Sequence, residues 1–361
     1  MEVETSYYQQ LLEQYLKKAV DDGASDLFII AGGKVSYKVD GAIQDLSEEK
    51  VFPDQTKELI QALYAMAGRD MRKYQTDGDD DFSFAKAGLA RFRVNAFRQR
   101  GSLAAVIRIV QFDIPDYRDL QIPEEVMKIA KEQHGMVIIS GTAGSGKSTT
   151  QACIIDKINQ ERAAHVITLE DPIEYLHSHK KSVVSQREIS NDTESYVTAL
   201  RAALRQAPNV ILLGEMRDYE TISTALTAAE TGHLVFSTLH TVGAANTIDR
   251  VIDAFPPSQQ PQIRVQLSMV LQAVVSQQLI PAKDGSVAPA FEIMKVNGAI
   301  RNMIRESKVH QIDTVIYSSA GEGMVSMDAS ILELYRQGKI SAEEAMTCAA
   351  APTVLAKKMG I

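Results

Sequence analysis

Apolar positions in the first third of the chain switch repeatedly between helical spacing and short extended runs. Helical spacing predicts one helix from a cap at Thr5 or Ser6 to about Ala19, and a second helix over residues 54–67. Extended runs separated by turn residues predict hairpins, and these runs cover residues 27–30, 35–39, 90–98 and 103–110. Together these elements predict a small α+β domain over residues 1–110.

After a linker expected over residues 111–120, short apolar runs alternate with helical segments. This alternation predicts an α/β domain with a parallel sheet over residues 121–361. The expected strands cover residues 136–140, 165–169, 210–213 and 234–238. The expected helices cover residues 149–160, a segment from a cap at Asp192 or Thr193 to residue 206, and residues 219–231. Beyond Pro256-Pro257 the spacing predicts mainly helices to the C-terminus.

Composition and charge narrow the class of protein. With 45% hydrophobic and 23% charged residues, the 361-residue chain has the balance of a globular protein. A net charge of −8 argues against stable nucleic-acid binding, which needs a basic surface. The apolar runs fall short of the roughly 18 residues that cross a bilayer, and the polar first residues do not resemble a secretory signal. Two distant cysteines supply neither a disulfide framework nor a four-cysteine zinc site, so we expect a cytoplasmic protein.

The strand expected over residues 136–140 leads into GTAGSGKS, which fits the phosphate-binding pattern G-x-x-x-x-G-K-[S/T]. Glycines let the backbone curl so that its N–H groups point at phosphate oxygens, and the next helix adds its dipole. Lys147 would place a positive charge at the outer phosphates, and Ser148 would offer a hydroxyl to Mg²⁺. A glycine turn between two core elements is the alternative. The candidate nucleotide contacts are Gly141, Thr142, Ala143, Gly144, Ser145, Gly146, Lys147, Ser148 and Thr149.

Two further expected strands end in carboxylates, at the edge where parallel sheets bind ligands. Glu215 follows the strand over residues 210–213, with Gly214 where aspartate is more usual, and we assign Glu215 to polarising the attacking water. The strand over residues 165–169 is followed by an acidic cluster suited to Mg²⁺ and its waters, namely Glu170, Asp171 and Glu174. Within it Glu170 is the next candidate for the water. A solvated turn or a helix start is the alternative for the cluster.

Two histidines, His233 and His240, flank the strand expected over residues 234–238. Beside a phosphate site they could contact the γ-phosphate, whereas an isolated histidine is more often structural. Both interpretations stay open.

Arginines gather on one expected hairpin of the first domain: Arg91, Arg93, Arg98, Arg100 and Arg108. In an acidic protein this density favours docking on something anionic, such as the nucleotide of a neighbouring subunit, where an arginine can stabilise phosphoryl transfer. Exposed ion pairs are the alternative. The acidic run over residues 77–81 lacks the spacing of a calcium loop, so we expect a solvated turn there.

The motifs in combination resemble those of a known family. GTAGSGKSTT, ITLEDPIEYLH, ILLGEMRD, TALTAAETGHLVFSTLHT and AANTIDRVIDAFP are similar, in order and spacing, to stretches of the secretion ATPases of the type II and type IV pilus class. The similarity extends to the first domain through GASDL, VDG, DFSF and RFRVNAFRQRG. It therefore covers nearly the whole chain.

This resemblance implies a PAS-like N-terminal domain, a RecA-like P-loop ATPase domain with C-terminal helices, and a homohexameric ring that binds ATP and Mg²⁺. It implies that Arg93 and Arg108 reach a neighbouring subunit's nucleotide. Residues 299–306, AIRNMIRE, resemble a segment typical of members that power type IV pilus retraction. The implied partners are an inner-membrane pilus platform protein and the pilus machinery, at the inner face of the cell membrane. The alternatives are a related pilus-assembly, secretion or DNA-uptake ATPase, or a nucleotide-gated regulator of another motor.

Overall fold

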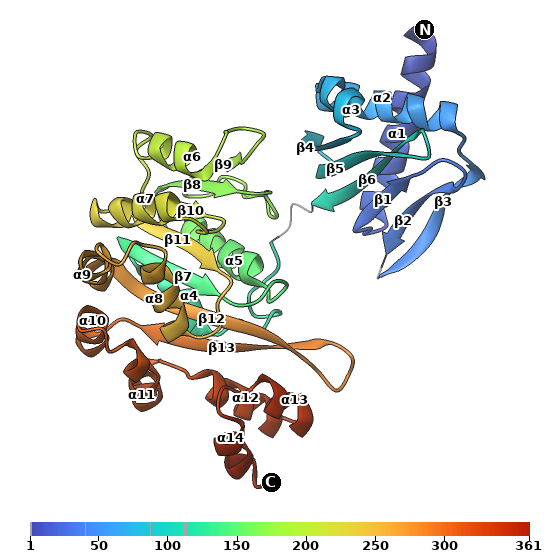
Figure 1. The fold of residues 1–361 in the computed structure, drawn as a ribbon. Helices are drawn as coiled ribbons and strands as arrows, with labels where there is room; N and C mark the ends of the chain where they lie inside the picture. The colour runs from blue at the N-terminus through green and yellow to red at the C-terminus, as the bar shows by residue number, and fades with distance from the viewer. Residues whose placement is uncertain (1, 40, 87, 111–113) are drawn as a thin grey trace. The chain divides into compact units, whose positions relative to one another are not determined.

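The computed structural model describes residues 2–39, 41–86, 88–110 and 114–361, with side chains from residue 7 onward. The chain divides into two compact units, residues 1–113 and 114–361 (Figure 1). Asp40, from the VDG motif, and residues 111–113, from the expected linker, lie outside the described residues. The rest of that linker belongs to the second unit, because Ile114, Tyr117 and Leu120 pack against its core.

The first unit contains a six-stranded antiparallel sheet in the order β3-β2-β1-β6-β5-β4. The hairpin predicted over residues 90–98 and 103–110 is confirmed as β5–β6, and the runs over residues 27–30 and 35–39 are confirmed as the paired strands β1 and β2. The strand β3, which pairs with β2, was not predicted. In chain order the elements are α1 (Glu2–Asp21), β1 (Asp26–Ile29), β2 (Lys34–Val39), β3 (Ala42–Lys50), α2 (Pro53–Ala67), α3 (Arg72–Asp77), β4 (Asp79–Lys86), β5 (Ala90–Gln99) and β6 (Ser102–Val110). The helix α1 begins at Glu2, so the predicted start after Thr5 or Ser6 is wrong.

Alternating burial along the strands shows that the core of this unit lies on one face of the sheet. On β5, Phe92, Val94 and Ala96 are buried, whereas Asn95 between them is exposed. The buried side chains join those of α1 and α2 in one apolar core. Burial of such side chains contributes about 1.5–3 kcal/mol each, which is what holds both helices on the sheet.

The acidic run over residues 77–81 is not the solvated turn that we predicted. Its first residue ends α3, Gly78 follows in the left-handed conformation at φ 85°, and the rest opens β4. Asp80 is buried. Its carboxylate accepts two hydrogen bonds from Arg69, at 2.8 and 2.9 Å, and one from the Tyr64 hydroxyl at 3.0 Å. A buried charge is tolerated only with such partners. The acidic run in the sequence does not show that Asp80 has them.

The second unit is built on a seven-stranded sheet in the order β13-β12-β7-β11-β10-β8-β9. All neighbouring strands are parallel except β12 and β13, so the predicted parallel sheet is confirmed. Its strands are β7 (Gly135–Ser140), β8 (His165–Glu170), β9 (Val183–Glu188), β10 (Val210–Leu213), β11 (Leu234–Leu239), β12 (Leu271–Pro281) and β13 (Val287–Lys295). Its helices are α4 (Glu124–Met127), η1 (Lys128–Lys131), α5 (Lys147–Glu161), α6 (Tyr196–Ala203), α7 (Tyr219–Glu230), α8 (Ala244–Asp253), α9 (Gln260–Val270), α10 (Gly298–Arg305), η2 (Val309–Gln311), α11 (Ile312–Ser318), η3 (Ala320–Glu322), α12 (Met327–Arg336), α13 (Ala342–Cys348) and α14 (Pro352–Met359).

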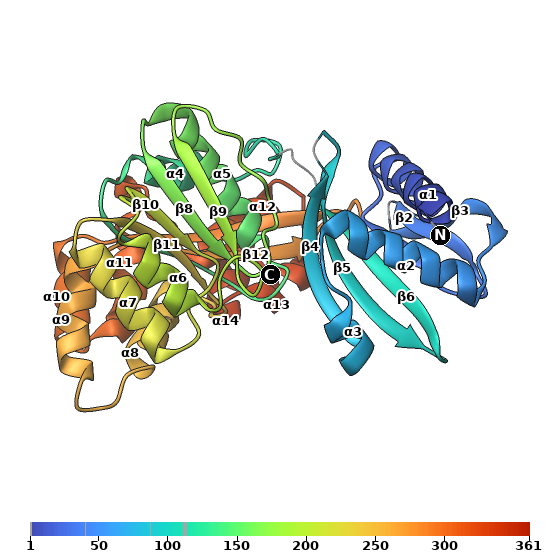
Figure 2. The ribbon, with the colours of Figure 1, turned by 90° about the horizontal axis from the view of Figure 1, so that it is seen from above.

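Helices cover both faces of this sheet, which explains why its strands read as unbroken apolar runs. Along β7, Met136 and Ile138 join the core beneath α6 to α10, whereas Val137 and Ile139 join the core beneath α4 and α5. Figure 2 shows α5 and α7 on opposite sides of the strands.

Three strands of this unit, β9, β12 and β13, were not predicted, and one helix start was predicted wrongly. After Pro256-Pro257 the chain is helical in α9 and again from α10 onward, but between these helices β12 and β13 form a hairpin that extends the sheet beside β7. Both strands are largely buried, and a continuous apolar run does not distinguish a buried strand from a buried helix. The helix expected from Asp192 or Thr193 begins after Ser195, whose hydroxyl accepts the Thr198 N–H.

The segment over residues 299–306 lies mostly in α10, whose buried side is narrow. Ile300 and Ile304 are buried, whereas Ala299 is exposed. The Arg301 guanidinium donates to the carbonyl oxygens of Ser268 and Met269, at 2.6 and 2.9 Å, near the end of α9. Arg301 therefore caps a helix C-terminus, where a cation stabilises unpaired carbonyls. None of the described helices combines the length and the apolar character that a bilayer crossing requires.

Removing the buried carboxylate of Asp80 should destabilise the first unit strongly. Asp80→Ala leaves Arg69 and the Tyr64 hydroxyl without their acceptor, and breaking a buried pair costs about 3–5 kcal/mol. Chemical denaturation of the full chain measures this loss. Asp79→Ala, at an exposed neighbouring position, is the matched control and should change the free energy of unfolding by less than about 0.5 kcal/mol. Equal effects of the two substitutions would contradict the account.

Candidate functional site

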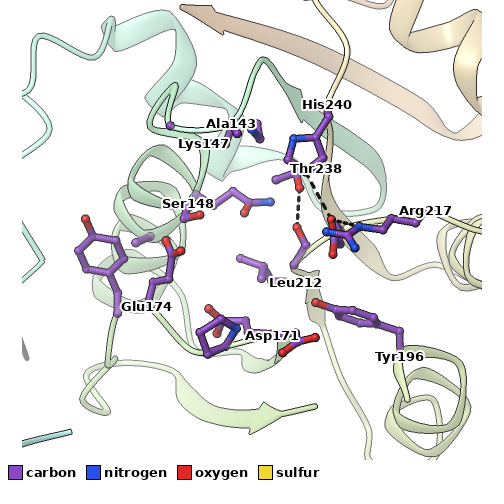
Figure 3. A pocket seen from close by; sticks show the side chains of 18 of the residues that line it. Ala143, Lys147, Ser148, Asp171, Glu174, Tyr196, Leu212, Arg217, Thr238 and His240 are labelled. Atoms are coloured by element: carbon purple, nitrogen blue, oxygen red, sulfur yellow. Dashed lines mark hydrogen bonds and ion pairs between the residues drawn. The ribbon is translucent and has the colours of Figure 1, made fainter. Parts of the chain in front are cut away.

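The strand order of the second unit brings the chemically distinct residues of the chain to one edge of the sheet. In the sheet β7, β11, β10 and β8 are neighbours and run in parallel, so their carboxyl ends face the same way. A cavity of about 260 Å³ opens at this edge (Figure 3). Residues that follow each of these four strands line it, which is where ligands bind in sheets of this kind.

The loop between β7 and α5 contributes the first wall of the cavity. Gly141, Gly144 and Gly146 have φ of 147°, 74° and 85°, values that side chains disfavour. At Gly141 a Cβ atom would also lie only 2.3 Å from the backbone oxygen of Gln277 on β12. From this loop the cavity is lined by Ala143, Gly144, Lys147 and Ser148.

Lys147 lies at the first turn of α5 and is nearly buried. Its ammonium group donates to the carbonyl oxygens of Gly141 and Thr142, at 2.9 and 2.7 Å. Burial lowers the pKa of Lys147, and the negative charges of Glu174 and Glu215 oppose that shift. The cation is therefore held against its own loop, beside the N–H groups that open α5. An anion bound there would interact with both the Lys147 ammonium group and these N–H groups.

Five of the predicted nucleotide contacts are not among the residues that line the cavity: Gly141, Thr142, Ser145, Gly146 and Thr149. The Thr149 hydroxyl lies 2.9 Å from the Tyr175 hydroxyl. The Ser145 hydroxyl is buried and has no hydrogen-bond partner among the described residues. Neither side chain is among those that line the cavity.

Glu170 ends β8 and is partly buried at the wall of the cavity. Its carboxylate accepts hydrogen bonds from the Thr168 hydroxyl at 2.6 Å and from the Gln186 amide at 3.3 Å. Burial raises the pKa of Glu170 to about 7, although these two hydrogen bonds oppose the shift. Gln186 also donates to the Tyr175 carbonyl and accepts the His177 N–H, so it ties the loop after β8 to β9.

Glu215 follows β10 and lies in a different environment. Its carboxylate is 2.6 Å from the Arg217 guanidinium and 3.4 Å from the imidazole of His240. On the neighbouring strand, the Thr238 hydroxyl donates to the Gly214 carbonyl at 2.5 Å and fixes the backbone there. One carboxylate of the cavity thus has only neutral hydrogen-bond donors as partners, and the other is paired with a cation.

Oxygen ligands for a metal ion line the same cavity. They come from Ser148 on one wall and from Glu170, Asp171 and Glu174 on the other. Hydroxyl and carboxylate oxygens with water are the usual ligands of Mg²⁺, so this donor set fits that ion. Among the described residues no group of three or more His, Cys, Asp or Glu side chains is arranged to hold a metal ion.

His233 is a correction to the predicted site. It precedes β11, whereas His240 follows it, so the two histidines lie at opposite ends of one strand. The His233 ring contacts the Ala228 carbonyl at 2.9 Å and the Thr231 hydroxyl at 3.2 Å, next to the end of α7. Ligands bind at the carboxyl ends of parallel strands, so the position of His233 before its strand already argued against a place in the site. The His233 role is structural.

The predicted arginines lie in the first unit. Arg93 and Arg108 face each other on β5 and β6, and Arg108 pairs with Asp26 at 3.1 Å. Several cavity residues were not predicted at all. Arg217 and His177 stand just outside the residues that we assigned, within two recognisable motifs, whereas nothing in the sequence pattern pointed to Gln151 or Tyr196.

Comparisons with known proteins agree with this geometry. A family model for type II/IV secretion system proteins matches residues 2–353. A twitching motility protein of Neisseria gonorrhoeae is 49% identical over 75% of this chain and 73% of its own length. The type IV pilus retraction ATPase PilT of Pseudomonas aeruginosa is 42% identical over 94% of this chain and 98% of its own length. A crystal structure of the pilus retraction motor PilT with bound ADP is 44% identical, covers 96% of this chain and 98% of that one, and has a TM-score of 0.88.

Glu170→Gln should stabilise the ligand-free protein at pH 8 but not at pH 4. The pKa of Glu170 rises from 4.5 to about 7 on folding, so between these values the unfolded chain releases a proton that the folded chain keeps. Folding is therefore penalised progressively above pH 4.5 and fully above pH 7, by up to about 3 kcal/mol. A neutral glutamine avoids the penalty.

Denaturant unfolding at the two pH values measures this difference. Glu174→Gln is the control, because Glu174 is exposed in the same cavity and its replacement should have little effect at either pH. A gain for Glu170→Gln that is the same at pH 4 and pH 8 would show that dehydration of the carboxylate is not its cause.

Proposed function

This chain belongs to the type II/IV secretion system protein family, and we propose that it is an ATP-hydrolysing motor that powers type IV pilus retraction. The single observation that carries the proposal is the cavity at the sheet edge. It combines a phosphate-binding loop with two carboxylates that follow neighbouring strands. The similarity to an ADP-bound retraction motor over 96% of the chain supports an adenine nucleotide as the ligand of this cavity.

In the proposed complex the β- and γ-phosphates of ATP lie over the loop of residues 141–148. The backbone N–H groups at the start of α5 and the Lys147 ammonium then meet the phosphate oxygens. In this complex the Lys147 ammonium group gives up its hydrogen bonds to the Gly141 and Thr142 carbonyls and donates to phosphate oxygens instead. The long, flexible side chain allows this change.

Ser148 would hold Mg²⁺ directly, and Glu170 with Asp171 would hold its waters; the ion would neutralise charge that develops on the phosphates. Glu215 polarises the attacking water. The Arg217 and His240 side chains hold the Glu215 carboxylate in place from one side. We assign His240 in addition to a contact with the γ-phosphate; its place among the residues that line the cavity supports this assignment.

The catalytic assignment predicts different failures for two substitutions. Lys147→Ala should weaken ATP binding, because the outer phosphates lose their cation. Glu215→Gln should bind ATP normally but hydrolyse it at least 100-fold more slowly, because an amide cannot take up charge from the attacking water. Glu220→Gln, an exposed neighbour on α7, is the matched control and should have wild-type rates.

Binding of a fluorescent ATP analogue and release of phosphate separate these outcomes. Wild-type hydrolysis by Glu215→Gln would move the assignment to Glu170. Absence of turnover in the wild-type protein, with ATP binding intact, would contradict the motor and favour a nucleotide-gated regulator.

We further propose that the protein acts as a homohexameric ring in which Arg93 and Arg108 reach the neighbouring subunit's nucleotide. These two residues are directly opposite on adjacent strands, where like charges are destabilising. Asp26 compensates Arg108 alone, and no ion pair involves Arg93 among the described residues. An anion supplied by another subunit would relieve this repulsion.

The ring is proposed to dock at the inner face of the cell membrane, on the platform protein of the pilus machinery. The segment that resembles retraction ATPases, α10, offers Arg305 for this contact, because Arg305 is exposed whereas Arg301 is engaged by α9. Platform and pilus components are thus the expected partners, and nucleic acid is not.

Mixing two inactive variants tests the action of arginine between subunits. Lys147→Ala and Arg108→Ala chains should each have low ATPase activity. In mixed rings some interfaces pair an intact loop with an intact arginine, so activity should exceed that of both parents. Arg100→Ala, at an exposed arginine of the same hairpin, replaces Arg108→Ala as the control and should be active by itself. Mixed rings no more active than the parents would contradict the trans arrangement.

A further inference from the structure

Tyr196 is a residue of the cavity that no motif of the sequence explained. It is the first residue of α6, directly after the Ser195 cap, and its ring packs against the apolar core beneath that helix. Its hydroxyl end points into the cavity, toward the side where the strands end (Figure 3). The ring is therefore fixed by packing, and the hydroxyl is presented to whatever occupies the cavity.

The hydroxyl occupies the space that a side chain at position 214 would need. A Cβ atom added to Gly214 would lie 2.8 Å from the Tyr196 oxygen, 3.4 Å from the Leu169 carbonyl oxygen and 3.5 Å from the Glu170 Cα. Gly214 does not have a positive φ, in contrast to the glycines of the phosphate loop. Its lack of a side chain is thus a matter of space and not of backbone conformation.

The charges around the Tyr196 hydroxyl determine which kind of group can accept a hydrogen bond from it. Burial raises the pKa of Tyr196, and the nearby carboxylates of Glu215, Asp171 and Glu170 raise it further, so the phenol keeps its proton. Among the described residues none accepts a hydrogen bond from it. A phosphate oxygen would be repelled by the three carboxylates, whereas a water molecule can accept from the hydroxyl and donate to a carboxylate.

We propose that the Tyr196 hydroxyl, which occupies the space that a side chain at position 214 would need, positions the attacking water beside Glu215. Tyr196 then donates one hydrogen bond to the water oxygen, and Glu215 accepts one from the water. This inference rests on the proposed ATPase function. It explains in one arrangement why the strand end reads Gly-Glu and why a tyrosine begins α6.

Tyr196→Phe removes the hydroxyl and keeps the ring that packs against the core. We expect kcat for ATP hydrolysis to fall about tenfold, while KM and the affinities for ATP and ADP stay within twofold of wild type. Tyr219→Phe is the matched control, because the Tyr219 hydroxyl contacts Gln259 outside the cavity, and it should leave kcat unchanged. An unchanged kcat in Tyr196→Phe, or a loss confined to KM and ATP affinity, would overturn the proposal.

A second substitution tests the shared space. Gly214→Ala should lower kcat in the wild-type background, because the new methyl group displaces the hydroxyl. In the Tyr196→Phe background it should lower kcat no more than twofold further, since the displaced atom is already absent. Independent losses that multiply in the double variant would overturn the link between the two positions.

Thermal unfolding of all variants identifies any loss of kcat that comes from misfolding. We expect each variant to unfold within about 3 °C of the wild-type midpoint. The wild-type rate is the reference for every comparison. If the wild-type protein does not hydrolyse ATP, both the proposed function and this inference are wrong. If the wild-type protein is active and Tyr196→Phe is equally active, only the inference is wrong.

Discussion

The close approach of backbone to backbone at the end of β7 is the constraint on which the site depends. Gly141 leaves β7 so near to Gln277 of β12 that any side chain would collide with its carbonyl oxygen. The loop therefore cannot move toward β12. It stays on the side of the cavity, where the backbone N–H groups at the start of α5 also lie. The hairpin of β12 and β13, packed beside β7, therefore shapes a loop that lies more than 100 residues away in the sequence.

From that fixed loop, the parallel register places the other groups at the same edge. Gly214 follows β10 between Leu169 of β8 and Thr238 of β11, and hydrogen bonds join its backbone to both neighbours. The carboxylates on either side differ because their environments differ. Burial raises the pKa of Glu170 to about 7, whereas Glu215 faces a guanidinium and an imidazole. Such a separation lets two residues of one chemical type take different roles in a reaction.

The sequence was sufficient for features that depend on local spacing. Glycine positions predicted the loop of residues 141–148, and apolar runs predicted the four strands that bring Glu170, Glu215 and His240 to one edge. It was insufficient where burial and long-range contact decide. Asp80 reads as one of several acidic residues, yet it is buried against Arg69; β12 reads as helix, because strands covered on both faces have no alternation. Tyr196 is separated from Gly214 by α6 and β10, so only the fold reveals their contact.

The central claim is that turnover at this sheet edge drives retraction of a pilus. The most direct measurement is the number of surface pili on cells that lack the gene, with complementation by the wild-type chain and by a Lys147→Ala chain. The account predicts excess pili in the deletion, a normal number with the wild-type chain and persistent excess with Lys147→Ala. Cells without pili after the deletion would contradict it, because that result is expected of an extension motor.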